Sequence, residues 1–179
     1  YQYSLEKSLS FGDPECWQAT FTVEVGPPVT LSDVGLSITG DAANDKKVMG
    51  QLEGGKPQVG SVLNHGSYEA FKRSILTRLN NRGFLSAEML TSTVVVNEEL
   101  TAAVIAIEVE SGSRYRFGAL SFTEGILDDD ILRSYRTFEA GDNYDADAIA
   151  ELHEKLRGSG FFASVTIRAE PVDGSLEVP

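Results

Sequence analysis

The sequence predicts an α+β fold of tandem units, each a three-stranded sheet covered by two helices. Similar segments recur in the same order roughly 80 residues apart, which indicates a repeat. Within each copy the apolar residues change from the alternating spacing of a strand to the three-and-four spacing of a helix. A glycine then follows each longer predicted helix, as is common where helices end. The expected order in a unit is strand, helix, helix, strand, strand.

Three pairs of segments carry the repeat. Residues 20–25 (TFTVEV) resemble residues 104–109 (VIAIEV), and residues 36–39 (LSIT) resemble residues 120–123 (LSFT), both at an offset of 84 (104 − 20). The third pair contains Gly83 and Gly160, an offset of 77 (160 − 83). A helix shorter by about one turn in the later copy accounts for the smaller offset.

Residues 29–112, the middle unit, hold a complete copy. We expect a strand over about 34–40, a helix over 45–52, a longer helix over 67–82, and strands over 86–96 and 101–109. Asn64 is placed to cap the longer helix and Gly83 to end it in a left-handed conformation. One apolar helix face is formed by Tyr68, Phe71, Ile75, Leu76 and Leu79.

Residues 113–179, the third unit, repeat this order. Here we expect a strand over 119–123, helices over 129–135 and 146–157, and a strand over 164–169. The cap is Asp145 and the helix-ending glycine is Gly160. The last strand begins near Leu176, so most of it is missing. Ile149, Leu152 and Leu156 recur on one face of the second helix.

The offset of 84 aligns Tyr1 with residue 85 of the middle unit (1 + 84), just after the second helix of that unit. Residues 1–28, the first unit, therefore match only the last two strands of a copy. A lone hairpin is marginally stable in water. The chain starts with Tyr1 rather than Met. We therefore expect its 179 residues to be a window on a larger protein with at least three units.

Charge argues against several classes of partner. The chain has 15 Lys and Arg against 27 Asp and Glu, a net charge of −12, which disfavours phosphate backbones and anionic membrane surfaces. From residue 118 onward there are 13 acidic and 5 basic residues, so this last stretch carries −8 of that charge. We expect no nucleic-acid partner. The acidic surface is either solvated or docks a basic patch of a partner.

Catalytic and metal-binding patterns are weak. Cys16 with His65 or His153 would be the only nucleophile–base pairs, and neither has a local signature. The carboxylates at 128–130 and at Asp142, Asp145 and Asp147 do not fit an EF-hand loop and are better explained as helix caps. Residues 53–56 (EGGK) lack the Ser or Thr of a phosphate loop. We expect no enzyme activity and no cofactor.

The spacing and motifs resemble the polypeptide-transport-associated (POTRA) domains of the Omp85 superfamily. Residues 83–84 (GF) and 160–162 (GFF) resemble the family's Gly-aromatic mark, and residues 109–118 (VESGSRYRFG) its acidic-Gly-x-x-Tyr junction. Residues 24–29 (EVGPPV) are a looser junction, with Val29 in place of the aromatic. Within the superfamily, residues 111–118 and 63–69 (LNHGSYE) look most like the TamA-type autotransporter assembly factors.

This resemblance implies the periplasmic arm of a Gram-negative outer-membrane assembly factor. Its partners would be unfolded outer-membrane or autotransporter polypeptides, an inner-membrane-anchored TamB-like protein, and the parent chain's own membrane barrel. A BamA-type barrel-assembly factor, a two-partner-secretion transporter, and a purely structural brace for the barrel remain alternatives.

The resemblance also implies where partners and neighbouring units meet. In the family the strand after the second helix is an edge strand that can pair with an extended polypeptide. Arg168 is equally suited to block unwanted pairing. The residues that match the edge strands here are Glu88, Leu90, Ser92 and Val94, and then Ser164, Thr166 and Arg168. The joints between units match Pro27 and Pro28 in the first case, and Gly112, Arg114 and Tyr115 in the second.

Overall fold

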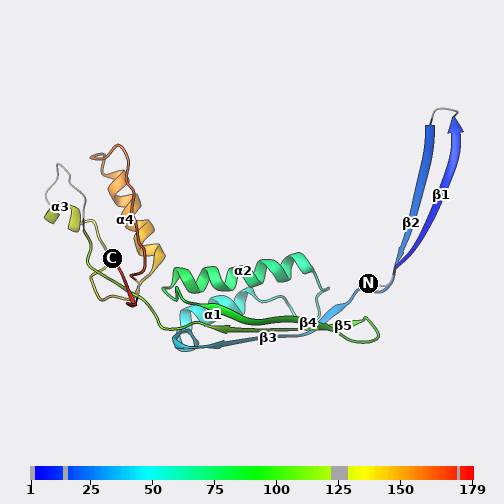
Figure 1. The fold of residues 1–179 in the computed structure, drawn as a ribbon, viewed down its shortest axis with the longest axis horizontal. Coiled ribbons are helices and arrows are strands. Elements are labelled where there is room, and N and C mark those ends of the chain that lie inside the picture. The colour runs from blue at the N-terminus through cyan, green and yellow to red at the C-terminus, as the bar shows by residue number, and fades with distance from the viewer. Residues whose placement is uncertain (1–2, 14–15, 122–128, 173) are drawn as a thin grey trace.

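We describe the chain from a computed structural model, which covers residues 3–13, 16–121, 129–172 and 174–179. Three blocks follow one another along the ribbon: a hairpin, a sheet with two helices on one side, and a smaller block around a helix (Figure 1). They correspond in order to the first, middle and third units. Among the described residues, no helix has the length and apolar character needed to cross a membrane.

The first block is an antiparallel hairpin of β1 (Tyr3–Asp13) and β2 (Cys16–Val25). Leu5 pairs with Val23 and Leu9 with Ala19, so alternate residues place apolar side chains on one face. That face is open: Leu9 is 70% exposed and Phe21 62%. The two strands expected here are present, and no described element covers their apolar side.

The middle unit contains a three-stranded sheet in the order β3–β5–β4. Its strands are β3 (Thr30–Thr39), β4 (Glu88–Val96) and β5 (Ala102–Glu110). β3 runs parallel to β5 and β4 antiparallel to it. Parallel neighbours need a long crossover, which the two helices supply, whereas a short turn suffices for the antiparallel pair. The Asn97 side chain organises that turn by accepting from Thr101 N (2.9 Å) and Ala102 N (2.8 Å).

Both helices of the middle unit lie on the same face of its sheet, and the opposite face is bare (Figure 1). After a short 3-10 turn, η1 (Asp41–Asn44), come α1 (Lys46–Gly55) and α2 (His65–Asn81). Asn64 caps α2 as predicted, its side chain accepting from Ser67 N at 3.0 Å. The expected apolar face is confirmed: Tyr68, Phe71, Ile75 and Leu79 are buried, and Leu76 is partly buried.

The third unit contains β6 (Arg116–Phe117), α3 (Asp129–Arg133), α4 (Ala146–Gly158) and β7 (Glu177–Val178). β6 pairs parallel with β7, as β3 does with β5. Asp145 caps α4, and Gly160 has the predicted positive φ of 76°. A second core cluster gathers here around Phe117, Phe138, Tyr144, Leu152 and Leu156.

Backbone hydrogen bonds show the same repeat at the start of the two units. Val29 corresponds to Tyr115, an offset of 86 (115 − 29), and Leu63 corresponds to Tyr144, an offset of 81 (144 − 63). The equivalent bonds are Leu63 N–Val29 O (2.8 Å) with Tyr144 N–Tyr115 O (3.0 Å), Gly60 N–Leu31 O (2.7 Å) with Gly141 N–Phe117 O (2.7 Å), Leu31 N–Ser61 O (2.8 Å) with Phe117 N–Asp142 O (2.8 Å), and Thr30 N–Thr101 O (2.9 Å) with Arg116 N–Leu176 O (2.8 Å).

Two strands predicted in the third unit are not found among the residues that the structure describes. Residues 119–121 have no strand, and residues 122–123 lie outside the described part of the chain. Residues 164–169 alternate between exposed and half-buried, as a strand would, but have no ladder partner among the described residues. In the middle unit the equivalent strand pairs with eight residues of β5, whereas β7 spans only two residues. A strand needs a neighbour to take its hydrogen bonds.

Candidate functional site

The joint between the middle and third units begins with a turn whose residues pack into the cores of both units. Gly83 ends α2 with φ 88°, and its carbonyl accepts from Tyr115 N at 2.8 Å. The next residue, Phe84, is buried in the core of the middle unit. Leu85 packs instead against the core of the third unit, where Tyr115 also packs. Three consecutive residues therefore connect the two units.

Gly83 admits no side chain. A Cβ at this position would lie 2.9 Å from Tyr144 O and 3.0 Å from Tyr144 Cβ, in addition to the cost of positive φ. The helix-ending glycine predicted from sequence thus has a second role: it lets the third unit approach the end of α2.

Arg114 spans the joint from the linker between the units. Its Nε donates to Arg82 O (2.9 Å), its Nη1 to Asp45 Oδ2 (3.2 Å) and its Nη2 to Tyr144 O (3.5 Å). Its backbone N–H also donates to Asp41 Oδ2 at 3.2 Å. A guanidinium has several donors in a fixed fork and can hold such partners together.

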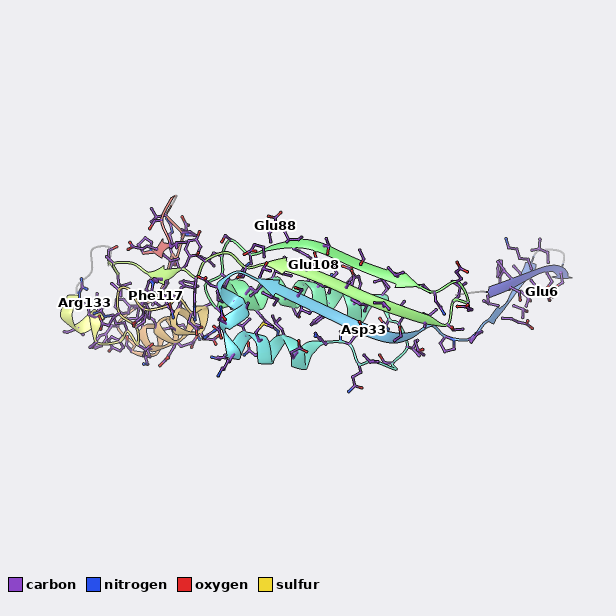
Figure 2. The ribbon with its side chains drawn as sticks, turned by 90° about the horizontal axis from the view of Figure 1, so that it is seen from below. Glu6, Asp33, Glu88, Glu108, Phe117 and Arg133 are labelled. Atoms are coloured by element: carbon purple, nitrogen blue, oxygen red, sulfur yellow. The ribbon has the colours of Figure 1, made fainter. Side chains whose placement is uncertain are left out.

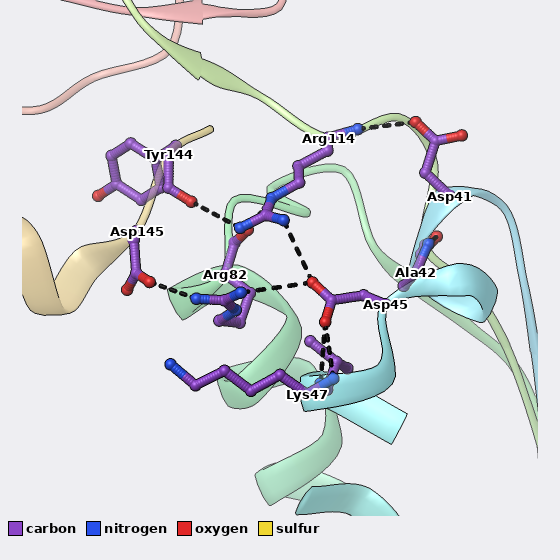
Figure 3. Close-up of polar contacts among 10 residues, drawn as sticks. Asp41, Ala42, Asp45, Lys47, Arg82, Arg114, Tyr144 and Asp145 are labelled. Carbon is purple, nitrogen blue, oxygen red and sulfur yellow. Dashed lines mark hydrogen bonds and ion pairs between the residues drawn. The ribbon is translucent and has the colours of Figure 1, made fainter. Parts of the chain in front are cut away.

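Arg82, at the end of α2, pairs with carboxylates that cap helices on both sides of the joint (Figure 3). Asp45 lies 3.5 Å from Arg82 Nη2 and caps α1 by accepting from Lys47 N (3.0 Å) and Val48 N (3.1 Å). Asp145, which bonds Arg82 Nη1, caps α4 through Asp147 N. Each carboxylate thus joins a helix dipole to a cation of the joint.

The surroundings of Asp45 and of Glu110 favour the charged forms of these two carboxylates. Burial alone raises the pKa of Asp45, but the hydrogen bond from Val48 N–H and the charges of Arg82 and Arg114 outweigh it and lower that pKa. Glu110, which precedes the linker, accepts from Thr39 Oγ1 and from Gly112 N, and these bonds lower its pKa.

The first joint has none of these contacts. Pro27 and Pro28 are exposed, and no hydrogen bond or ion pair joins the described residues of the hairpin to the middle unit. Val29, the counterpart of Tyr115, is buried in the core of the middle unit. The junction motif is therefore present twice in the sequence, but the described residues form a bonded joint only at the second.

β4 offers an open sheet edge along its length. Its backbone pairs with β5 on one side, and no other backbone hydrogen bond involves residues 88–96 in the described structure. The opposite edge is partly covered, because the loop at 60–63 bonds both Leu31 and Val29 of the β3 edge. β4 also carries a single charge, Glu88, followed by eight uncharged residues with no proline. Such an edge lacks the usual protection against pairing.

The predicted edge residues of β4 do not share one face. A bulge between Met89 and Thr91 shifts the pairing by one residue at Leu90. Glu88 and Leu90 are exposed, whereas Ser92 and Val94 are half-buried. After the bulge the open face is formed instead by Thr91, Thr93 and Val95, each exposed and paired across the sheet with Glu108, Ala106 and Val104.

The second predicted edge is absent as a strand. Ser164, Thr166 and Arg168 are exposed on a segment outside any ladder, while the residues between them pack on the core of the third unit. His153 Nε2 lies 3.3 Å from Val165 O and ties this segment to α4.

The residues considered for catalysis lie on separate elements. Cys16 opens β2, His65 opens α2 and His153 lies on α4, three elements in three different blocks (Figure 1). Asp142 accepts from Glu139 N at 2.8 Å, so its carboxylate organises a turn. Asp128 lies outside the described residues. Within the described residues, no three His, Cys, Asp or Glu side chains could hold a metal ion.

Sequence reasoning missed Arg82 and Asp45 as joint residues. The sequence pattern indicates Asp45 only as the start of a helix, and Arg82 only as the end of one. The available signal was a helix ending in a cation directly before Gly83.

No family model matches the sequence. BamA POTRA3–5 from Haemophilus influenzae is 19% identical and superposes with a TM-score of 0.55, covering 99% of this chain and 70% of its own. BamA from Haemophilus ducreyi lacking POTRA domains 1–3 is also 19% identical, with a TM-score of 0.63 over 83% of this chain. This chain spans 28% of the length of that protein. The predicted fold class is confirmed: the chain has the α+β fold of POTRA domains.

Proposed function

We propose that the chain belongs to the periplasmic interaction arm of an outer-membrane protein assembly factor. The observation that carries this proposal is the open β4 edge on a unit with the POTRA fold. An extended client segment would add to β4 as a fourth strand and gain main-chain hydrogen bonds. Clients of this kind are unfolded β-barrel or autotransporter segments, which are rich in alternating strands.

The division into units belongs to the same proposal. Residues 1–28 are taken as the last two strands of one POTRA unit, 29–112 as a complete unit, and 113–179 as a third. In support, the apolar face of β2 (Ala19, Phe21, Val23) matches the buried residues Ala103, Ile105 and Ile107 of β5 at the offset of 84 (103 − 19). A face of this composition fits the underside of a pair of helices.

Within the superfamily we propose a TamA-type factor, on the strength of the junction at 111–118 and the turn at 63–69. Such an arm would dock a TamB-like, inner-membrane-anchored partner and would sit beside the parent chain's own barrel. A BamA-type factor or a two-partner-secretion transporter is the alternative parent.

The joint favours a second candidate function, a rigid brace that holds the units at a fixed angle. Arg82 and Arg114 connect three helix ends, and Leu85 crosses into the neighbouring core. A brace requires such a joint but no open edge. The two functions are compatible, and client binding distinguishes the arm from a brace alone.

The test is a titration of the full 179-residue chain with peptides from unfolded outer-membrane barrels, followed by amide chemical shifts. Strand addition predicts shifts along β4 that Thr93→Lys abolishes, because a lysine on an edge opposes pairing. The matched control is Ser37→Lys, which adds the same charge to the exposed face of β3. An absence of shifts in β4 at millimolar peptide would contradict client binding and favour the brace.

A further inference from the structure

Charge in the middle unit is divided between its two layers. The three strands carry Asp33, Glu88, Glu108 and Glu110 and contain no Lys, Arg or His. The turn between β4 and β5 adds Glu98 and Glu99. All seven Lys and Arg residues between 29 and 112 lie on the helices or their caps: Lys46, Lys47, Lys56, Lys72, Arg73, Arg78 and Arg82.

Most carboxylates on the three strands have no polar partner in the described structure. Glu88 and Glu108 make no ion pair or side-chain hydrogen bond in the described structure, and neither does Asp33. Three cations of the helix layer have partners: Lys56 with Glu53, Lys72 with Glu69, and Arg82 with Asp45 and Asp145. Both layers therefore hold some unpaired charge in the described structure, but on the strands, which include the open edge, that charge is entirely negative.

The geometry places this charge beside the strand that would be added. Glu88 lies on β4 itself, and Glu108 lies opposite Thr91 on the adjoining strand. Both lie toward the end of the bare face that adjoins the third unit (Figure 2). Further along the edge, Val95 is 63% exposed and pairs with Val104, 38% exposed. A residue added next to Glu88 is within reach of its carboxylate, because cross-strand neighbours are about 5 Å apart.

We propose that the β4 edge selects extended segments with Lys or Arg at the end that meets Glu88, with Glu108 one strand further in, followed by aliphatic residues that meet Val95. This inference rests on the proposed strand addition and adds the chemistry of the client. Opposite charges across a strand pair stabilise it and like charges oppose it, so one edge can discriminate between clients that are equally good strands.

The test uses two synthetic peptides of alternating Thr and Val, one with two lysines at one end and its twin with two glutamates. Amide shifts of the full chain are followed at low ionic strength. We expect the lysine peptide to bind β4 about tenfold more tightly than its twin, with the preference falling at high salt. Glu88→Gln with Glu108→Gln should remove most of that preference. The matched control, Glu170→Gln with Glu177→Gln, removes the same charge from the third unit and should preserve it.

The outcomes separate the inference from the proposed function. Equal binding of both peptides at β4 would overturn the charge selection and leave strand addition intact. Lysine-peptide shifts confined to the third unit would show non-specific attraction to its acidic surface and would also overturn it. If neither peptide shifts β4, the proposed strand addition fails as well.

Discussion

The two junctions of this chain have related sequences but different structures. At the second, Arg114 and Tyr115 bond to the end of α2 and to the backbone of Tyr144, Arg114 also bonds to the α1 cap Asp45, and Tyr115 packs on the core of the third unit. At the first, Pro27 and Pro28 are exposed, and no hydrogen bond or ion pair crosses from the described part of the hairpin. The difference teaches that the linker does not make the joint alone. The partners of the second linker come from the turn that ends α2, from the start of α1 and from the residue before the α4 cap.

Gly83→Ala should break the second joint most severely. The new Cβ would meet Tyr144 O at 2.9 Å and occupy a positive φ, so we expect a loss of about 3 kcal/mol in unfolding free energy. Gly60→Ala is the matched control. Gly60 has nearly the same φ, 86°, but open space around it, and should cost about 1 kcal/mol. Denaturant unfolding measures both, and equal losses would show that Tyr144 does not limit this position.

Arg82→Met should weaken the joint next. It leaves the caps Asp45 and Asp145 without their shared cation, and these side chains are mostly buried, so we expect a loss of about 2 kcal/mol. Arg73→Met is the control, because Arg73 is exposed on the same helix and forms no ion pair with the described part of the chain. Small-angle scattering should show a wider distribution of angles between the middle and third units for Arg82→Met only. A similar change in both variants would contradict the role of the network.

Tyr115→Ala makes the second joint more like the first. The side chain is half-buried against the core of the third unit, so its removal should cost about 1 kcal/mol and loosen the interunit angle. Val29→Ala removes the counterpart at the first joint and should destabilise the middle unit without changing that angle. Unchanged scattering for Tyr115→Ala would disprove the packing role of this tyrosine.

Acid should weaken the second joint as well, but by less than the substitutions described above. The pKa of Asp45 is lowered in the folded protein, so its contribution to stability is present above about pH 4 and is lost as the pH falls further. Asp45→Asn keeps a capping residue but lacks the titrating group. We therefore expect its melting temperature to fall less than that of the wild type between pH 6 and pH 3. Parallel falls would indicate that Asp45 is not linked to folding.

Much of the fold could be predicted from local patterns. The spacing of Phe71, Ile75 and Leu79 identifies α2, and Asn64 and Gly83 mark its ends, because caps and helix periodicity depend on residues close in sequence. The strand at 164–169 could not be rejected on this basis. Its alternation is real, and the structure preserves it as alternating burial, but a ladder also requires a neighbouring strand.

The candidate site was less predictable. An alternating pattern assigns Glu88, Leu90, Ser92 and Val94 to one face, and nothing in the residues reveals the bulge that separates them. Arg82 meets Asp45 across 37 residues and Asp145 across 63. Contacts at such separations depend on how two units are docked, which single-sequence patterns do not encode.

The parallel pairing of β3 with β5 gives the middle unit a mechanical property. The chain enters the unit at Thr30 and leaves it after Glu110, and the ladder places these points at opposite ends of the sheet. A pull along the chain therefore loads the β3–β5 ladder in shear, and its nine pairs must yield together. The hairpin behaves differently: its two ends meet at the Tyr3–Val25 pair, so the same pull opens it one pair at a time. The unit that would receive clients is also built to carry tension.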